Sequence, residues 1–265
     1  GYERLIEGKS YLDELSGQAK EKETVWALIK AAFEILREHY GKVTVNFGEP
    51  IYLDDSLAKH APQWREDRDN TEGKLPWLAD VVEELAQQIN VNINGAADVN
   101  PVNLLALALL STPKHAMDET DLIEQIELSK RILRDEPYSA RITVTALNAK
   151  SIIAYGEEMG VICRTKHPLG DVLSMQGETA VLQSYFRNNV LHLFSAAAWI
   201  ALCFQNNRRL SRHGLVHLGL NVYPFMRSEM FLPWSDAEFA ERLNKTIDLF
   251  IREGYLFVSK DDSEF

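Results

Sequence analysis

The sequence predicts an α+β fold that is mostly helical: a short α/β unit is followed by a long helical region with short hairpins. Three observations predict it. Apolar residues recur at the helical period over several segments after residue 75. Val43, Val45 and Phe47 alternate with polar residues, which is the spacing of a strand. A helix, a glycine and two strand-like runs follow one another over residues 148–175, an order that resembles the end of a winged helix.

The first α/β unit consists of one expected helix and one expected strand. Residues 23–40 carry apolar side chains at the helical period, and Gly41 ends this helix. The strand of residues 43–47 follows, and Gly48 and Pro50 end it. A helix, a glycine and a strand in this order are typical of an α/β domain.

Polarity then divides the chain into three parts. A polar stretch, KHAPQWREDRDNTEG, predicts a linker, after which helical patterns dominate. We expect the end of an α/β domain over residues 1–57, a linker over 58–75 and a helical region over 76–265.

The helical region predicts a series of well-marked elements. Asp118 or Thr120 could cap a clear amphipathic helix that Pro137 ends. Gly160 is expected to stop a later helix in front of the hairpin. The expected elements are helices over 76–94, 102–111, 117–137 and 148–159, a strand over 142–145, and hairpin strands over 161–165 and 171–175.

The last part of the chain repeats one of these patterns. A helix that ends at Gly254 and a strand-like run follow one another much as they do around Gly160. This indicates either a weak internal repeat or the ordinary use of glycine between a helix and a strand. A single helix of about 25 residues is expected over residues 179–204.

That long helix contains an unusual polar stretch, SYFRNNVLHLF. Burying such groups is costly unless they are paired. On one continuous helix they form a stripe that a single facing surface could satisfy. We favour a buried structural joint or domain interface and leave direct substrate contact open. The residues of this joint are Tyr185, Arg187, Asn188, Asn189 and His192.

Composition excludes some classes of function. The chain has 265 residues, of which 46% are apolar and 25% are charged, which allows a hydrophobic core. The formal net charge of −11 argues against nucleic acid as a partner, because phosphate backbones attract Lys and Arg. We expect Cys163 and Cys203 to be buried free thiols in a reducing compartment. Both ends of the chain look cut, so we expect it to be a piece of something longer.

Motifs for the usual chemistries are missing from the sequence. It contains no glycine-rich phosphate loop, no G-x-S-x-G, no C-x-x-C and no H-E-x-x-H. His213 and His217 are four residues apart but have no third ligand near them, so no metal site is expected. The longest apolar run, residues 190–204, is too short to span a membrane and is interrupted by His192.

Several phrases taken together resemble one enzyme family. They are GYE, KEKETVW, VNFGEPIYL, PYSA and SYFRNNVLHLF, in this order and spacing. The chain resembles the bacterial membrane-associated glycerol-3-phosphate 1-O-acyltransferases, the PlsB family, over essentially its whole length. The resemblance implies transfer of a fatty acyl group from acyl-CoA or acyl-carrier protein to sn-glycerol 3-phosphate, which gives lysophosphatidic acid. It implies no cofactor beyond this co-substrate.

The chain departs from the family in its catalytic motif. The family uses an H-x-x-x-x-D pair, in which the His is the general base and the Asp orients it. None of the seven histidines here is followed by Asp five positions later, and there is no E-G-T-R. The chain therefore resembles the portion after the catalytic motifs, and we expect no catalytic residue and no activity in it alone. The alternative is a non-catalytic helical scaffold or interaction module.

The resemblance also implies where substrate and membrane would be met. Tyr2 and Glu3 would close the family's fourth sequence block near the cleft, and Lys20 and Lys22 could meet a phosphate, although solvated lysines are the simpler reading. A peripheral position on the cytoplasmic face of the bacterial inner membrane follows, with a homo-oligomer left open. The candidate residues for an anionic membrane surface are Arg208, Arg209 and Arg212. A core helix followed by a solvated arginine cluster is the simpler reading.

Overall fold

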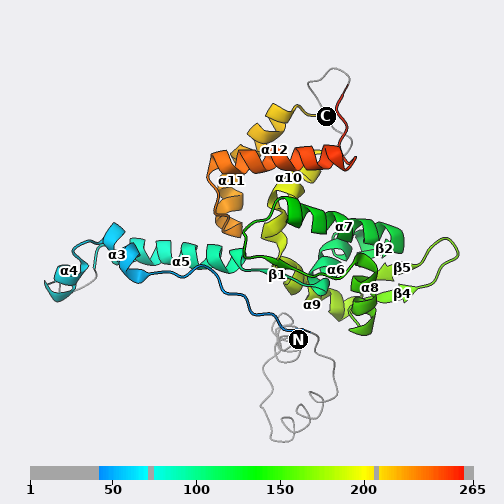
Figure 1. The fold of residues 1–265 in the computed structure, drawn as a ribbon, viewed down its shortest axis with the longest axis horizontal. Coiled ribbons are helices and arrows are strands. Elements are labelled where there is room, and N and C mark those ends of the chain that lie inside the picture. The colour runs from blue at the N-terminus through cyan, green and yellow to red at the C-terminus, as the bar shows by residue number, and fades with distance from the viewer. Residues whose placement is uncertain (1–41, 71–74, 206–208, 260–265) are drawn as a thin grey trace, which may run out of the picture. The chain divides into compact units, whose positions relative to one another are not determined.

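The computed structural model describes residues 42–70, 75–205 and 209–259 (Figure 1). These residues fall into two compact units. The first unit holds residues 42–45, Asp98–Arg131 and Val144–Leu191, and the second holds Asn46–Ala97, Ile132–Thr143 and residues 192–259. Helices predominate and the strands are short, so the expected α+β, mostly helical class is confirmed.

The first unit combines short helices with a small sheet. Strands β2, β5 and β4 form an antiparallel sheet in that order, and β1 pairs with β3. The order α6, β2, α7, α8, β4, β5 with this strand order resembles that of a winged helix. The elements are β1 (Asp98–Val99), α6 (Pro101–Leu109), η1 (Pro113–His115), β2 (Ala116–Asp118), α7 (Glu119–Asp135), β3 (Thr143–Val144), α8 (Ala149–Glu158), β4 (Cys163–Thr165), β5 (Val172–Ser174) and α9 (Gly177–Asn188).

Helix α6 is the centre of this unit. It packs against α8 and α9, and Leu105 is fully buried. A Cβ atom at Gly156 would lie 2.4 Å from Leu105 Cδ1, so the glycine makes room for the Leu105 side chain of α6 against α8. Asn100 caps α6 by accepting from two backbone amides, and the Asn103 amide donates to the Phe186 carbonyl at 2.7 Å. The helices are thus fixed by both apolar and polar contacts.

The second unit is built from helices around an aromatic core. Tyr223 and Phe239 are fully buried and stacked, with ring centroids 4.0 Å apart, and the Tyr223 hydroxyl donates to the Trp234 carbonyl at 2.7 Å. Ser235 and Glu238 form a capping box that begins the last helix. The elements are α3 (Leu53–His60), α4 (Trp64–Asn70), α5 (Leu78–Gly95), η2 (Leu191–Phe194), α10 (Ser195–Cys203), α11 (Arg212–Met230) and α12 (Asp236–Arg252).

The expected single helix over residues 179–204 is wrong. Helix α9 ends at Asn188, the short 3-10 turn η2 follows, and α10 begins at Ser195. The Val190 amide bonds to the Arg187 carbonyl three residues back, which tightens the chain out of the α-helix. Two successive asparagines precede the break, and asparagine side chains compete with helical hydrogen bonds.

Three further expectations are corrected. Residues 43–47 are extended but form no strand, because no neighbouring strand pairs with them among the described residues. The polar residues 58–75 are not one loop: α3 runs to His60, and α4 lies within them. No strand follows Gly254 among the residues described, so the second copy of the supposed repeat lacks one of its parts.

The strongly patterned elements are confirmed. Helices α5, α6, α7 and α8, strand β3 and the β4–β5 hairpin lie where the sequence places them. Asp118 is the residue whose carboxylate accepts from the Thr120 amide at the start of α7, at 2.8 Å. Gly160 follows α8 with φ of 62°, as expected for a helix stop. The helix expected over residues 23–40 lies outside the described residues.

The cysteines differ in exposure. Cys203 is buried in α10, as expected, whereas the expectation is wrong for Cys163, which is exposed on β4. The apolar run that precedes Cys163 suggested burial, but only Val161 and Ile162 are buried, because β4 is an edge strand of its sheet.

Among the described residues, no helix combines the length and the apolar character that crossing a bilayer requires.

Candidate functional site

His192 is the centre of a polar cluster in the second unit. It lies in η2, is buried, and its Nε2 atom lies 3.1 Å from the Asn94 carbonyl oxygen at the end of α5. Because a carbonyl only accepts, this contact requires the proton on Nε2. Burial lowers the pKa of His192 from its ordinary value of 6.5, against the smaller opposing effect of the Asn94 carbonyl. The ring is therefore neutral at pH 7.

Tyr138 covers one edge of the His192 ring. The two ring centroids lie 5.1 Å apart at an interplanar angle of 87°. The Tyr138 hydroxyl donates to the Phe231 carbonyl at 3.0 Å, and the Asn94 side chain donates to the Met230 carbonyl at 2.8 Å. Burial raises the pKa of Tyr138 to about 12. The cluster thus ties α5 and the loop after α7 to the C-terminal end of α11.

Arg242 on α12 is the last member of this polar cluster. Its guanidinium lies 4.0 Å from the centroid of the Trp234 ring, and it donates to the Pro137 carbonyl at 2.6 Å. Trp234 in turn packs edge-on against Tyr138, with centroids 5.0 Å apart. Burial lowers the pKa of Arg242. We call Asn94, Tyr138, His192, Trp234 and Arg242 the His192 cluster.

The His192 cluster is arranged for packing rather than for base catalysis. A general base must reach the proton that it removes. His192 is buried, and its Nε2 atom faces a backbone carbonyl. The donors of Tyr138 and Arg242 also end on backbone carbonyls. The cluster can hold segments together, and nothing in its contacts provides a base for an incoming substrate.

Titration of His192 predicts a specific pH dependence of stability. Its folded pKa lies below the unfolded value of 6.5, so its contribution is complete above pH 6.5 and is lost as pH falls through the folded pKa. We expect His192→Phe to cost about 1–2 kcal/mol at pH 8, because the Asn94 carbonyl loses its donor. The cost should shrink as pH falls below 6.5, as measured by urea denaturation.

The exposed His213 provides the control for this measurement. His213→Gln should change the free energy of unfolding by less than about 0.5 kcal/mol at either pH. A cost of His192→Phe that stays constant from pH 8 to pH 5 would contradict a neutral, buried His192.

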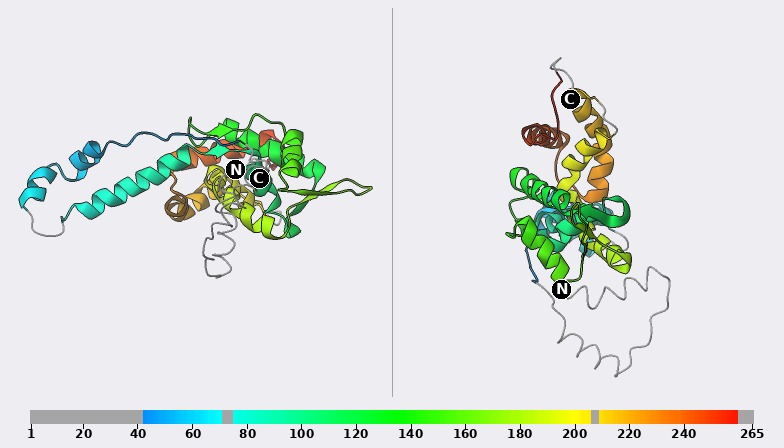
Figure 2. Two further views of the ribbon diagram at one scale, coloured as in Figure 1. Left: turned by 90° about the horizontal axis from the view of Figure 1, so that it is seen from below. Right: turned by 90° about the vertical axis from the view of Figure 1, so that its right-hand side faces the viewer.

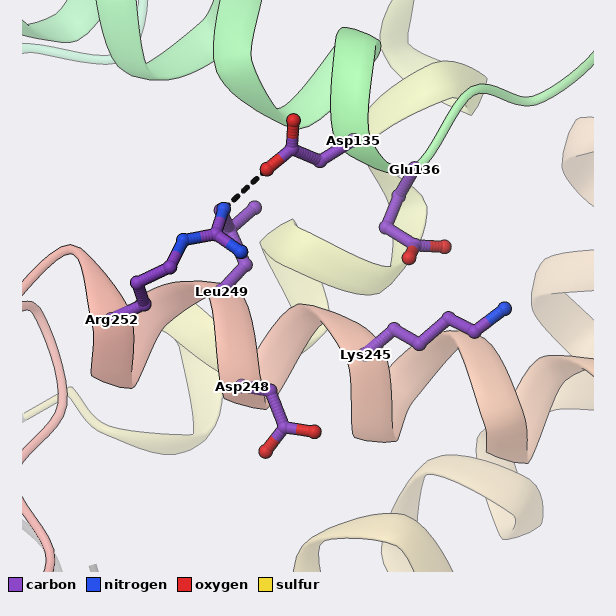
Figure 3. Close-up of a pocket in the computed structure, with 6 residues that line it drawn as sticks. All are labelled: Asp135, Glu136, Lys245, Asp248, Leu249 and Arg252. Carbon is purple, nitrogen blue, oxygen red and sulfur yellow. Dashed lines mark hydrogen bonds and ion pairs between the residues drawn. The ribbon is translucent and has the colours of Figure 1, made fainter.

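A pocket of about 500 Å³ lies beside α12 in the second unit (Figure 3). Arg252 forms an ion pair with Asp135, Lys245 pairs with Glu241 at 2.8 Å, and burial raises the pKa of Glu136. Three carboxylates and two cations line it, so its charge does not favour a phosphate group. The lining residues are Asp135, Glu136, Lys245, Asp248, Leu249 and Arg252.

A second charged cluster belongs to the first unit. Arg164 on β4 donates to Glu119 at 2.7 Å, to Glu157 at 2.8 Å and to Asp171 at 3.0 Å. Hydrogen bonds from Arg164 lower the pKa of Glu119, and its carboxylate partners, Glu157 first, raise the pKa of Arg164. This Arg164 cluster joins α7, α8 and the hairpin. Nothing in the sequence points to this cluster beyond an arginine in a strand of the expected hairpin.

The predicted joint residues are not brought onto one stripe. Tyr185 and Arg187 are half-buried at the end of α9, and Asn188 and Asn189 are exposed. Arg187 donates to the Asn188 side chain at 3.0 Å. His192 lies beyond the end of α9, so the continuous helical stripe is wrong, and so is burial of the two asparagines. The role of these residues as a joint stays a prediction.

The other predicted site residues are only partly described. Tyr2, Glu3, Lys20, Lys22 and Arg208 lie outside the described residues. Arg209 is exposed, whereas Arg212 is half-buried and forms an ion pair with Asp248 at 2.5 Å.

The chain is similar in sequence to one enzyme family over nearly its whole length. The family model described as the glycerol-3-phosphate acyltransferase C-terminal region matches residues 11–264. A glycerol-3-phosphate acyltransferase of Xanthomonas campestris is 60% identical over 262 residues, which are 99% of this chain and 30% of that protein. Those of Xylella fastidiosa (strain 9a5c) and Pseudomonas aeruginosa are 56% and 39% identical over 100% and 98% of the chain. The chain spans about a third of the length of these curated relatives.

Proposed function

Because the chain belongs to the family of the glycerol-3-phosphate acyltransferase C-terminal region, we propose that it is the non-catalytic C-terminal part of such an enzyme. The whole enzyme would transfer a fatty acyl group from acyl-CoA or acyl-carrier protein to the 1-hydroxyl of sn-glycerol 3-phosphate. Lysophosphatidic acid and the free thiol are the products. The likeness to relatives that bear this activity in their names supports the proposal.

The proposal rests on one observation, which is that the sequence lacks the H-x-x-x-x-D pair of the family. In the reaction, a base takes the proton of the glycerol hydroxyl as its oxygen attacks the thioester carbonyl, and the thiolate leaves. No histidine here has Asp five positions later, and the buried His192 faces a backbone carbonyl. The base would therefore come from the upstream part of the polypeptide.

Residues 1–57 are proposed to complete the α/β domain that carries this base. Val43, Val45 and Phe47 alternate along extended backbone, and their side chains are 66%, 71% and 81% exposed. Such a segment fits the edge of a sheet in the upstream part, which would bury these side chains. Tyr2, Glu3, Lys20 and Lys22 would then lie near the substrate cleft.

The joint residues are proposed to fix the helical region to the acyltransferase domain. Arg187 is the member best suited to meet an acidic partner, because its guanidinium keeps donors beyond those given to Asn188. On this proposal Arg187→Ala in the full-length enzyme lowers stability together with activity. A normal fold with only a raised KM for glycerol 3-phosphate would instead indicate substrate contact.

We also propose that the arginines after α10 meet an anionic membrane surface. Arg209 is exposed, and Leu202 and Leu218 on the flanking helices are 55% and 45% exposed. We expect Arg208→Glu with Arg209→Glu to weaken flotation on anionic liposomes at least tenfold, since each basic residue near such a surface contributes about 1 kcal/mol. Arg212 is left intact because it pairs with Asp248.

The exposed Lys166 provides a control for the flotation assay, and Lys166→Glu should bind as the unchanged protein does. Equal flotation of the double variant and the unchanged protein would contradict the membrane role of these arginines.

The proposed function is tested on the full-length polypeptide that contains this chain. Labelled sn-glycerol 3-phosphate and palmitoyl-CoA should give labelled lysophosphatidic acid. A folded full-length protein that forms no such product with either acyl-CoA or acyl-carrier protein as donor would overturn the proposal.

A further inference from the structure

One face of helix α5 in the second unit is apolar and exposed. Leu78, Val82, Ile89 and Ile93 are 40%, 54%, 47% and 64% exposed, and the half-buried Leu85 lies between them. Steps of four, three, four and four residues keep these five side chains on one side of the helix. We call them the α5 seam.

The neighbouring face of α5 is in contact with other residues of the second unit. Val81 is 2% exposed, and Glu84 accepts from Lys59 of α3 at 2.7 Å. At the other end, Asn94 belongs to the His192 cluster. The helix is therefore held in place by one side while its seam faces outward, which is the arrangement of a docking surface rather than of a frayed helix.

The chain that precedes α3 runs beside the C-terminal half of α5. The Asn92 side chain donates to the Glu49 carbonyl at 2.8 Å, and the Glu49 carboxylate pairs with Arg141 at 2.6 Å. A Cβ atom at Gly48 would lie 2.8 Å from the Asn92 carbonyl oxygen. Figures 1 and 2 show this extended segment alongside the helix. Residues 48 and 49 are thus held against the C-terminal half of α5, next to the seam.

We propose that the α5 seam docks onto an apolar surface of the upstream α/β domain of the same polypeptide. The inference rests on the proposed function, which supplies that domain, and on the relatives, of which the chain spans only 30%. The occupant is an attached domain, so its effective concentration is of millimolar order and a small seam is enough.

A second copy of the chain fits the seam less well. Burying one large aliphatic side chain removes about 100 Å² from water, so five partly exposed ones supply a few hundred Å² at most. A stable dimer needs about 800 Å² on each partner. The seam is therefore too small for a free partner but sufficient for a tethered one.

Hydrogen exchange of the α5 amides tests this docking. The amides of residues 82–93 should exchange at least tenfold more slowly in the full-length enzyme than in the chain alone. Val82→Asp and Ile89→Asp in the full-length enzyme should abolish most of that difference. Ala79→Asp is the matched control, because Ala79 is exposed on α5 outside the seam, and it should leave the protection unchanged.

Three outcomes would overturn the docking. They are equal exchange in the two proteins, protection of the chain alone that rises with its concentration, and protection that needs added liposomes. The outcomes also separate this inference from the proposed function. If the full-length protein forms lysophosphatidic acid but its α5 amides exchange as fast as those of the chain alone, only the docking is contradicted. If the full-length protein protects these amides but forms no lysophosphatidic acid, the proposed function is contradicted and the docking is supported.

Discussion

Replacing Phe239 by alanine is expected to lower the free energy of unfolding by about 4 kcal/mol, the range found for buried aromatic residues. Phe239 is fully buried in α12. The centroid of its ring lies 4.0 Å from that of Tyr223 and 6.4 Å from that of Trp234, and both pairs are stacked. Removal of the ring leaves a cavity that these rigid neighbours cannot fill. Urea denaturation followed by tryptophan fluorescence measures the loss.

Phe225 on α11 is the matched control, because the same side chain is 68% exposed there. Phe225→Ala should change the free energy of unfolding by no more than about 0.5 kcal/mol. Similar losses for the two variants would show that the aromatic core does not hold the second unit together.

Arg164→Gln is expected to destabilise the first unit by about 2 kcal/mol at pH 7, less than the roughly 3–5 kcal/mol of a fully buried pair because the cluster is partly open to water. Without the guanidinium, the carboxylates of Glu119, Glu157 and Asp171 face one another with no cation between them. Thermal unfolding of the variant measures the effect.

The pH dependence of that loss identifies its cause. Arg164 holds the pKa of Glu119 below its ordinary value of 4.5, so the stabilisation is complete above pH 4.5 and is lost as pH falls through the lowered pKa. The cost of Arg164→Gln should therefore shrink from pH 7 to pH 3. Lys166→Gln, an exposed change in the same hairpin, should cost nothing measurable. An equal cost of Arg164→Gln at both pH values would point to lost packing of the side chain instead.

Local signals explain why much of the fold could be predicted. Helix α7 begins beside Asp118, one of the two cap residues that the sequence suggests. Gly160 marks the end of α8 and the beginning of the hairpin. Each of these signals lies within a few residues of the element that it marks, so sequence alone reveals it.

The wrong predictions concern features that local pattern does not determine. Residues 43–47 have the alternation of a strand, but a strand also needs a paired neighbour. The helix over residues 179–204 has a continuous apolar pattern, yet the chain turns after Asn188 and buries Val190 fully. The predicted stripe of polar residues requires that continuous helix, so both predictions are wrong for the same reason.

The site could be predicted only in part, because its contacts are distant in sequence. The sequence singles out His192 as a polar residue in an apolar run, and this residue is buried and hydrogen-bonded. Its partner Asn94 is 98 residues away, and Tyr138 bonds to a carbonyl 93 residues away. No periodicity or spacing connects such positions.

The measurement that tests the central proposal most directly is an acyl-transfer assay of the chain and of the full-length polypeptide side by side. Both receive labelled sn-glycerol 3-phosphate, palmitoyl-CoA and the same liposomes, and circular dichroism first establishes that both are folded. We expect labelled lysophosphatidic acid from the full-length protein and none above background from the chain. Product formed by the chain alone would contradict the proposal, because it would require a catalytic base within these 265 residues.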